Sequence, residues 1–151
     1  MNEDLIVRKI ENGTVIDHIA AGKGLKVINI LGIDLKQDQL AVVLVNVPSK
    51  KLGKKDMIKI EKRELTEREV SKIALIAPEA TLSIIRDWNI VEKKKIDLPD
   101  VLQGVVDCPN TNCITKDEKI IVSKFFVENK EPLKIRCNYC ERVFSRDEIK
   151  I

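Results

Sequence analysis

Apolar and polar residues alternate in two parts of the N-terminal half, as they do in a strand that buries one face. One part is residues 13–19 (GTVIDHI), after the turn signal Asn12-Gly13, and the other is residues 57–65 (MIKIEKREL). Aliphatic stretches at 4–11, 38–47 and 80–91 predict further extended segments, the second of which we expect to end at Pro48. Residues 38–47 and 57–65 should pair as a hairpin, because a polar, glycine-containing turn joins them.

Two segments have helical spacing instead. Leu25, Ile28 and Leu31 recur every third residue and predict a helix that ends at Gly32. Thr66 and Glu69 have the spacing of a capping box, and apolar residues follow at helical intervals until Pro78. The order β-α-β-β-α-β predicts a ferredoxin-like domain, in which two helices cover one face of an antiparallel sheet and the other face stays open.

The last third of the chain predicts a second, smaller domain. Residues 92–100 are charged and contain Pro99, so we expect the linker there. Short strands are predicted at 102–106, 119–127 and 133–137. The predicted class is therefore α+β, with a ferredoxin-like βαββαβ domain at 1–98 and a small all-β domain with four cysteines at 99–151.

Composition supports two domains that are stabilised in different ways. A chain of 151 residues suffices for two small domains, and all four cysteines lie after residue 107. No stretch has the length of a signal peptide core or a membrane span, which predicts a cytoplasmic protein without a membrane partner. The 27 basic and 24 acidic residues are interleaved, so charge alone gives no support for nucleic acid binding.

The four cysteines form two close pairs. Cys108 and Cys113 enclose four residues, Cys137 and Cys140 enclose two, and 23 residues separate the pairs. Two such loops joined by a hairpin predict one structural zinc ion per chain, because four thiolates close a tetrahedral shell and leave no position for a substrate. The alternatives are two disulfides or four unrelated core thiols. The reducing cytoplasm disfavours the disulfides.

Several polar side chains are candidates for a ligand site in the first domain. Asp17 and His18 are adjacent and could reach one ligand if the strand ended there; otherwise His18 is a structural histidine. By strand parity Lys59 and Met57 should share the open face, although Lys59 could equally be a solvated lysine. Ser83 and Ile85 share one face of their strand by the same parity.

Five segments together resemble a known family. GTVIDHI, GKKDMIKIE, LIAPEATLSIIRD, CPNTNCI and CNYCE occur in the order and spacing of the regulatory chain of aspartate carbamoyltransferase, and the resemblance covers nearly the whole chain. It implies a non-catalytic subunit that binds CTP or ATP in its first domain, with UTP as a further candidate. It also implies a regulatory-chain homodimer and docking on a separate catalytic chain, through which pyrimidine biosynthesis is regulated.

The resemblance also implies which residues surround the nucleotide. They are Val15, Asp17, His18, Met57, Lys59, Ser83, Ile85, Trp88, Ile90 and Lys93. Lys59 and Lys93 would supply cations for ribose and phosphates, and the apolar members would flank the base. Trp88 and Ser83 stand where relatives carry other residues, which leaves the preference among nucleotides open.

Docking is predicted at the rim of the zinc site, where a metal would hold polar and aromatic side chains rigidly. The candidates are Asn112, Asn138, Tyr139, Glu141 and Arg142. Arg142 is the strongest candidate for a salt link; the alternative is a solvated charge.

Two other functions have less support from the sequence. An enzyme is disfavoured, because one histidine and the lack of a glycine-rich phosphate loop leave no recognised catalytic motif. A zinc-ribbon protein that binds nucleic acid is the alternative, but the first domain offers only Trp88 for base stacking. We therefore expect no nucleic acid partner.

Overall fold

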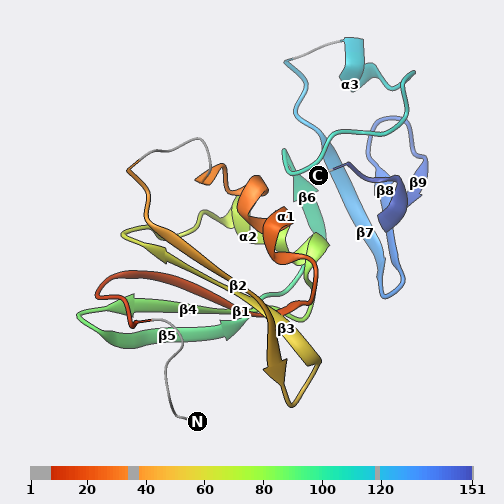
Figure 1. Cartoon of the computed structure of the whole chain (residues 1–151). Coiled ribbons are helices and arrows are strands. Elements are labelled where there is room, and N and C mark those ends of the chain that lie inside the picture. The colour runs from red at the N-terminus through yellow and green to blue at the C-terminus, as the bar shows by residue number, and fades with distance from the viewer. Residues whose placement is uncertain (1–7, 34–37, 118–119, 151) are drawn as a thin grey trace. The chain divides into compact units, whose positions relative to one another are not determined.

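The computed structural model describes residues 8–33, 38–117 and 120–150 (Figure 1). Internal contacts divide the chain into two compact units. The first joins the chain up to Leu65 with Glu79–Lys95, and the second joins Thr66–Pro78 with the chain from Ile96 onward.

The first unit is an antiparallel sheet of five strands. They are β1 (Gly13–Ala20), β2 (Ala41–Ser49), β3 (Gly53–Glu61), β4 (Thr81–Arg86) and β5 (Asn89–Lys95), in the spatial order β2-β3-β1-β4-β5. The order β2-β3-β1-β4 is that of the predicted ferredoxin-like arrangement, and β5 adds a strand at the edge. The predicted α+β class is confirmed.

One face of this sheet is buried by alternating aliphatic residues. Ile16, Ile58 and Ile60 are fully buried, and Leu82 is nearly so. The helix α1 (Gly24–Ile30) contacts β2 and β3 and buries Val27. It ends as predicted, with Gly32 at a left-handed φ of 65° just after the cap residue.

Three predictions about the strands were wrong. Residues 80–91 are not one strand, because a turn at Asp87 and Trp88 divides them into β4 and β5. Consequently residues 92–95 belong to β5 and not to the predicted linker. The strand β2 continues through Pro48, which is tolerated because β2 lies at the sheet edge and its outer N–H groups need no partner.

The N-terminal strand prediction is only partly testable. Residues 8–12 form no strand, and residues 4–7 lie outside the described part of the chain. The backbone of this segment bonds instead to the turn between β4 and β5, where the N–H of Trp88 donates to the Glu11 carbonyl at 2.9 Å.

The second unit contains α2 (Glu67–Ile76) and a four-stranded sheet. Both hydrogen bonds of the capping box join Thr66 and Glu69, as predicted. The strands are β6 (Val101–Gln103), β7 (Lys124–Lys130), β8 (Leu133–Cys137) and β9 (Val143–Ser145), in sequential order. A short helix α3 (Ile114–Asp117) and the 3-10 turn η2 (Arg146–Glu148) complete the unit.

The strands of this sheet differ from those expected. β6 ends at Gln103, and β7 begins at Lys124 and not near residue 119. β9 was not predicted, because a strand of three residues carries too little alternation to be recognised. The fully buried side chains of this sheet are Phe125, Leu102 and Ile135. A core of this size is too small to give a stable fold without further support.

Candidate functional site

The open face of the first sheet carries a row of predicted site residues in register. Val15 on β1 lies opposite Lys59 on β3 and opposite Ser83 on β4. Ser83 in turn lies opposite Lys93 on β5. Four of the ten nucleotide candidates therefore share one line across four strands, and the buried face holds their neighbours Ile16, Ile58 and Leu82.

A bulge brings one further candidate, Ile90, to this face beside Ile85. Register in β4 and β5 shifts so that Ile84 opposes Glu92 while Ile85 opposes Ile90. Ile90 and Lys93 are three residues apart and would face opposite ways in a regular strand. The extra residue restores them to one face, together with Ile85.

A second bulge explains how Asp17 and His18 come together. Between Ile16 and Ile19, β1 has one residue more than β3, so that Asp17 and His18 both oppose Met57. The strand therefore does not end here, as was expected, but continues after a residue with φ of 59° at His18. The His18 ring nitrogen Nδ1 lies 3.0 Å from the Thr81 hydroxyl, and the Lys55 ammonium pairs with the Asp17 carboxylate at 2.9 Å.

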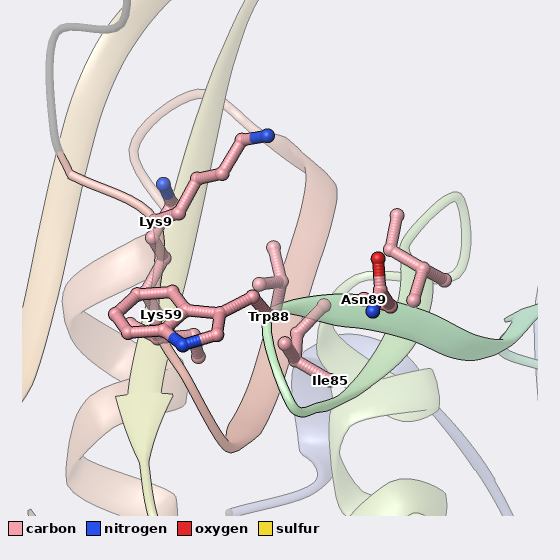
Figure 2. A pocket seen from close by; sticks show the side chains of 8 residues that line it. Lys9, Lys59, Ile85, Trp88 and Asn89 are labelled. Carbon is pink, nitrogen blue, oxygen red and sulfur yellow. The ribbon is translucent and has the colours of Figure 1, made fainter.

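A cavity of about 340 Å³ opens at one end of the row. Its lining combines five predicted residues with three that were not predicted: Val15, Lys59, Ile85, Trp88 and Ile90, and then Lys9, Ile10 and Asn89. Figure 2 shows the Trp88 indole extending to the side where Lys9 and Lys59 lie, with Ile85 and Asn89 on the other side. Asp17, His18, Met57, Ser83 and Lys93 do not line it.

Trp88 occupies a backbone conformation that bulky residues rarely adopt. Asp87 and Trp88 have φ of 51° and 71° in the turn between β4 and β5, where hairpins usually place Asn-Gly. A large side chain at positive φ costs about 1–2 kcal/mol. The indole is also 53% exposed, so burial does not offset that cost. Strain of this kind is typical of ligand sites.

Positive charge is concentrated at the cavity. Burial lowers the pKa of Lys59, and the nearby charge of Lys9 lowers it further. The Lys59 ammonium donates to the Arg8 carbonyl at 3.2 Å, and none of the ion pairs among the described residues includes Lys9, Lys59 or Lys93. An apolar wall beside uncompensated ammonium groups suits a ligand with a flat ring and anionic groups.

The four cysteines form a single cluster in the second unit. Sγ of Cys108 lies 3.7 Å from Sγ of Cys140, and Sγ of Cys113 lies 3.7 Å from Sγ of Cys137. All four sulfurs lie within 4.8 Å of one another. Sulfurs at the usual Zn–S distance around a tetrahedral ion are ~3.8 Å apart, whereas bonded sulfurs are ~2.0 Å apart.

The pKa shifts of the four thiols differ in direction: burial raises the pKa of Cys108 and Cys137, whereas burial is outweighed by hydrogen bonds that lower the pKa of Cys113 and Cys140. Burial raises the pKa of Cys113, but hydrogen bonds from the side chain and backbone of Thr115, with the neighbouring thiols, bring it down to about 7. The Thr115 hydroxyl donates to the Cys113 sulfur at 3.2 Å. In structural metal sites, donors such as this hydroxyl orient the thiolate that binds the metal. The cluster is consistent with a structural zinc ion.

Comparison with known proteins assigns both domains to one family. Residues 5–97 match the family described as the allosteric domain of the aspartate carbamoyltransferase regulatory chain, and residues 100–150 match its metal binding domain. The chain belongs to the aspartate carbamoyltransferase regulatory chain family. The regulatory chain of Pyrococcus furiosus is 55% identical over 97% of this chain and 96% of its own length. That of Pyrococcus abyssi is 56% identical over the same shares, and that of Methanothermobacter thermautotrophicus is 49% identical over 97% and 94%.

Membership of this family means that the protein is a regulatory, non-catalytic chain with an allosteric and a metal-binding domain, and it implies association with a catalytic chain. The described helices include none that is long and apolar enough to cross a membrane.

Three cavity residues of this regulatory chain were missed from the sequence. Lys9 and Ile10 lie before the first predicted turn, in a segment without regular structure, and Asn89 follows the unrecognised hairpin turn. A basic residue next to the turn signal Asn12-Gly13 is a weak signal, because this chain has 27 lysines and arginines. Only the pairing of β1 and β4 shows that these segments meet.

The residues predicted for docking lie on the cysteine loops. Asn112 and Arg142 line a cavity of about 310 Å³ beside Phe144. The Tyr139 hydroxyl donates to the Val122 carbonyl at 2.9 Å, which fixes a ring that is 39% exposed. The backbone N–H of Asn138 donates to the Lys124 carbonyl, and Glu141 has a φ of 63°. Exposed aromatic and arginine side chains are enriched at binding hot spots.

We expect Arg142→Ala and Tyr139→Ala each to weaken assembly with the catalytic chain by about 2 kcal/mol, or roughly thirtyfold. The measurement is the dissociation constant of zinc-loaded regulatory chain and catalytic chain. The matched control is Arg136→Ala, because Arg136 is an exposed arginine that lies on strand β8, just before the loop of Cys137 and Cys140, and already pairs with Glu128 of β7. Unchanged assembly in both loop variants would place the interface elsewhere.

Proposed function

We propose that this regulatory chain binds CTP and ATP, with UTP as a further ligand, on the open face of its five-stranded sheet. The observation that carries the proposal is the row Lys59, Val15, Ser83 and Lys93, set beside the cavity under Trp88. It supplies ammonium groups for an anion and an apolar surface for a ring on one face.

The two ends of the face suit different parts of a nucleotide. The cavity with Trp88, Ile85 and Ile90 is mostly apolar and suits a base, because aromatic and aliphatic surfaces stack against flat rings. At the other end Asp17, which pairs with Lys55, and His18 are polar and suit ribose hydroxyls and phosphates, and Met57 adds an apolar surface beside them. Lys93 lies on the edge strand β5 and adds a cation for the phosphates, and Lys59 lines the cavity from β3, two residues from Met57.

We also propose how the effect reaches the catalytic chain. The unit with four cysteines would hold one zinc ion through Cys108, Cys113, Cys137 and Cys140 and present the docking loops. A nucleotide can then alter the catalytic chain only if the assembled states bind it with different affinity. The family matches at 5–97 and 100–150 support a domain boundary at residues 98 and 99. A regulatory-chain homodimer and a cytoplasmic location belong to the same proposal, and no nucleic acid or membrane is needed as a partner.

The proposal is tested by direct nucleotide binding, for which Trp88 is a built-in reporter because it is the only tryptophan. Titration with CTP and ATP should change its fluorescence and saturate. We expect Lys93→Ala to weaken binding about tenfold, the value of one charge-assisted hydrogen bond. Lys94→Ala is the matched control, since Lys94 is adjacent in β5 and pairs with Glu92. Equal affinity in the two variants would exclude Lys93 from the site, and no saturable binding to wild type would overturn the proposal.

A further inference from the structure

A carboxylate occupies a core position in β3, where the burial pattern calls for an apolar side chain. Asp56 is fully buried and follows the same alternation as Ile58 and Ile60. A buried carboxylate is costly unless hydrogen bonds replace its water. None of the ion pairs among the described residues includes Asp56. Hydrogen bonds from other groups must therefore stabilise this carboxylate in the core.

Those partners are three backbone N–H groups from two segments that are distant in sequence. Oδ2 accepts from Gly22 at 3.1 Å and from Gly24 at 2.9 Å, in the connection from β1 to α1. Oδ1 accepts from Asn46 at 3.0 Å, in β2. One side chain thus holds two irregular segments whose amides have left the regular ladder.

Both of these segments adjoin a bulge. Between Leu44 and Val47, β2 has one residue more than β3, and Asn46 there has a φ of 58°. On the other side of β3, Asp56 lies opposite Ile19, the first paired residue after the β1 bulge. Asp56 therefore stands between two bulged strands and fixes the chain on both sides of β3.

The β1 bulge is the one that turns both Asp17 and His18 to the open face. His18 has a left-handed backbone, which persists only where the surrounding structure determines it. Upstream it is held by the pairing of Ile16 with Ile58, and downstream by Ile19 opposite Asp56 and by the bonds of Asp56 to Gly22 and Gly24. The residue before Asp56, Lys55, pairs with the Asp17 carboxylate.

We infer that Asp56 is a positioning residue of the nucleotide site, which acts through the backbone to aim Asp17 and His18. It touches no ligand, because it lies on the buried face. This inference rests on the proposed nucleotide function. It explains why a strand that otherwise buries only isoleucines keeps an acid at this point.

Two variants test the inference by different routes. Asp56→Asn keeps the shape but replaces one acceptor oxygen by an amide that faces an N–H donor. Gly24→Ala leaves the carboxylate in place but sets a methyl group 2.9 Å from Oδ2. Helix propensity alone favours alanine over glycine, so a loss of stability in Gly24→Ala would come from this contact with Asp56.

The measurements are CTP affinity and the imidazole NMR signals of zinc-loaded full-length chain. His18 is the only histidine, so its signals need no assignment. We expect both variants to bind CTP about tenfold more weakly and to shift the His18 signals. Thr14→Val is the control for loss of a buried polar contact, because the buried Thr14 hydroxyl donates to the Arg63 carbonyl away from Asp56. It should leave the His18 signals in place.

Outcomes separate this inference from the function on which it rests. If wild type binds CTP and Gly24→Ala binds it equally well with unshifted His18 signals, the positioning role is overturned and the nucleotide site stands. If Asp56→Asn does not fold, Gly24→Ala decides the matter alone. If wild type binds neither CTP nor ATP, the proposed function fails, and a role of Asp56 in nucleotide binding fails with it.

Discussion

Removal of zinc is expected to unfold residues 101–151 and to abolish docking on the catalytic chain, while the β1–β5 sheet stays largely folded. The second sheet buries few large side chains, chiefly Phe125, Leu102 and Ile135. Ligation by four thiolates contributes about 10–16 kcal/mol in small zinc domains. That is as large as the whole stability of an ordinary domain, about 5–15 kcal/mol, so the fold should not survive its loss.

Hydrogen exchange of the whole chain measures this directly. After chelation, or in Cys108→Ser, the amides of β7 and β8 should lose protection while those of β1 and β3 keep it. Thr115→Ala is the matched control, because Thr115 bonds to the Cys113 sulfur without being a ligand. It should weaken zinc affinity about tenfold to a hundredfold yet fold in excess zinc. A metal-free chain that kept its protection in β7 and docked normally would contradict the prediction.

The helix α2 makes the same experiment informative about the domain boundary. It precedes the proposed boundary by more than twenty residues, yet its contacts group it with the chain from Ile96 onward. If α2 loses protection together with β7 on chelation, the unit that unfolds cooperatively includes α2 and does not coincide with the proposed domain after residue 98. If it stays protected with β1 and β3, the boundary at residues 98 and 99 also describes folding.

Regular elements were predictable because their signals are local. The alternation in residues 57–65 identified β3, although the strand runs from Gly53 to Glu61 and so takes in part of the predicted turn, and it correctly placed Met57 and Lys59 away from the buried isoleucines. The capping box of Thr66 and Glu69 fixed the start of α2, since both bonds form within one turn. The cysteine spacing likewise predicted one cluster, which the sulfur distances confirm.

Irregular features were not predictable, and they shape much of the ligand site. The β4–β5 hairpin was missed because Asp87-Trp88 lacks the glycine that usually marks such a turn. The bulges in β1 and β5 insert one residue each without any composition signal, yet they decide the facing of His18 and Lys93. Lys9 reaches the cavity through tertiary pairing alone.

Lys59→Ala is expected to weaken CTP and ATP binding about tenfold to a hundredfold and to reduce the nucleotide response of the assembled complex in proportion. Lys59 lines the cavity and stands in the row opposite Val15. Burial and the charge of Lys9 already disfavour its ammonium form in the free chain. The negative charge of an anionic ligand would offset both effects, so this cation should contribute as a charged hydrogen bond does, about 1.5–3 kcal/mol.

Substrate saturation of the complex, with and without each nucleotide, separates binding from regulation. Activity without nucleotide should be unchanged in Lys59→Ala, because the catalytic residues belong to another chain. Allosteric coupling is typically about 1–3 kcal/mol, so weaker binding should move the response to higher nucleotide concentration. Lys26→Ala is the control, an exposed lysine of α1, the helix that contacts β2 and β3. Lys59→Ala that kept both full affinity and full response would remove Lys59 from the site and leave Lys9 and Lys93 as its cations.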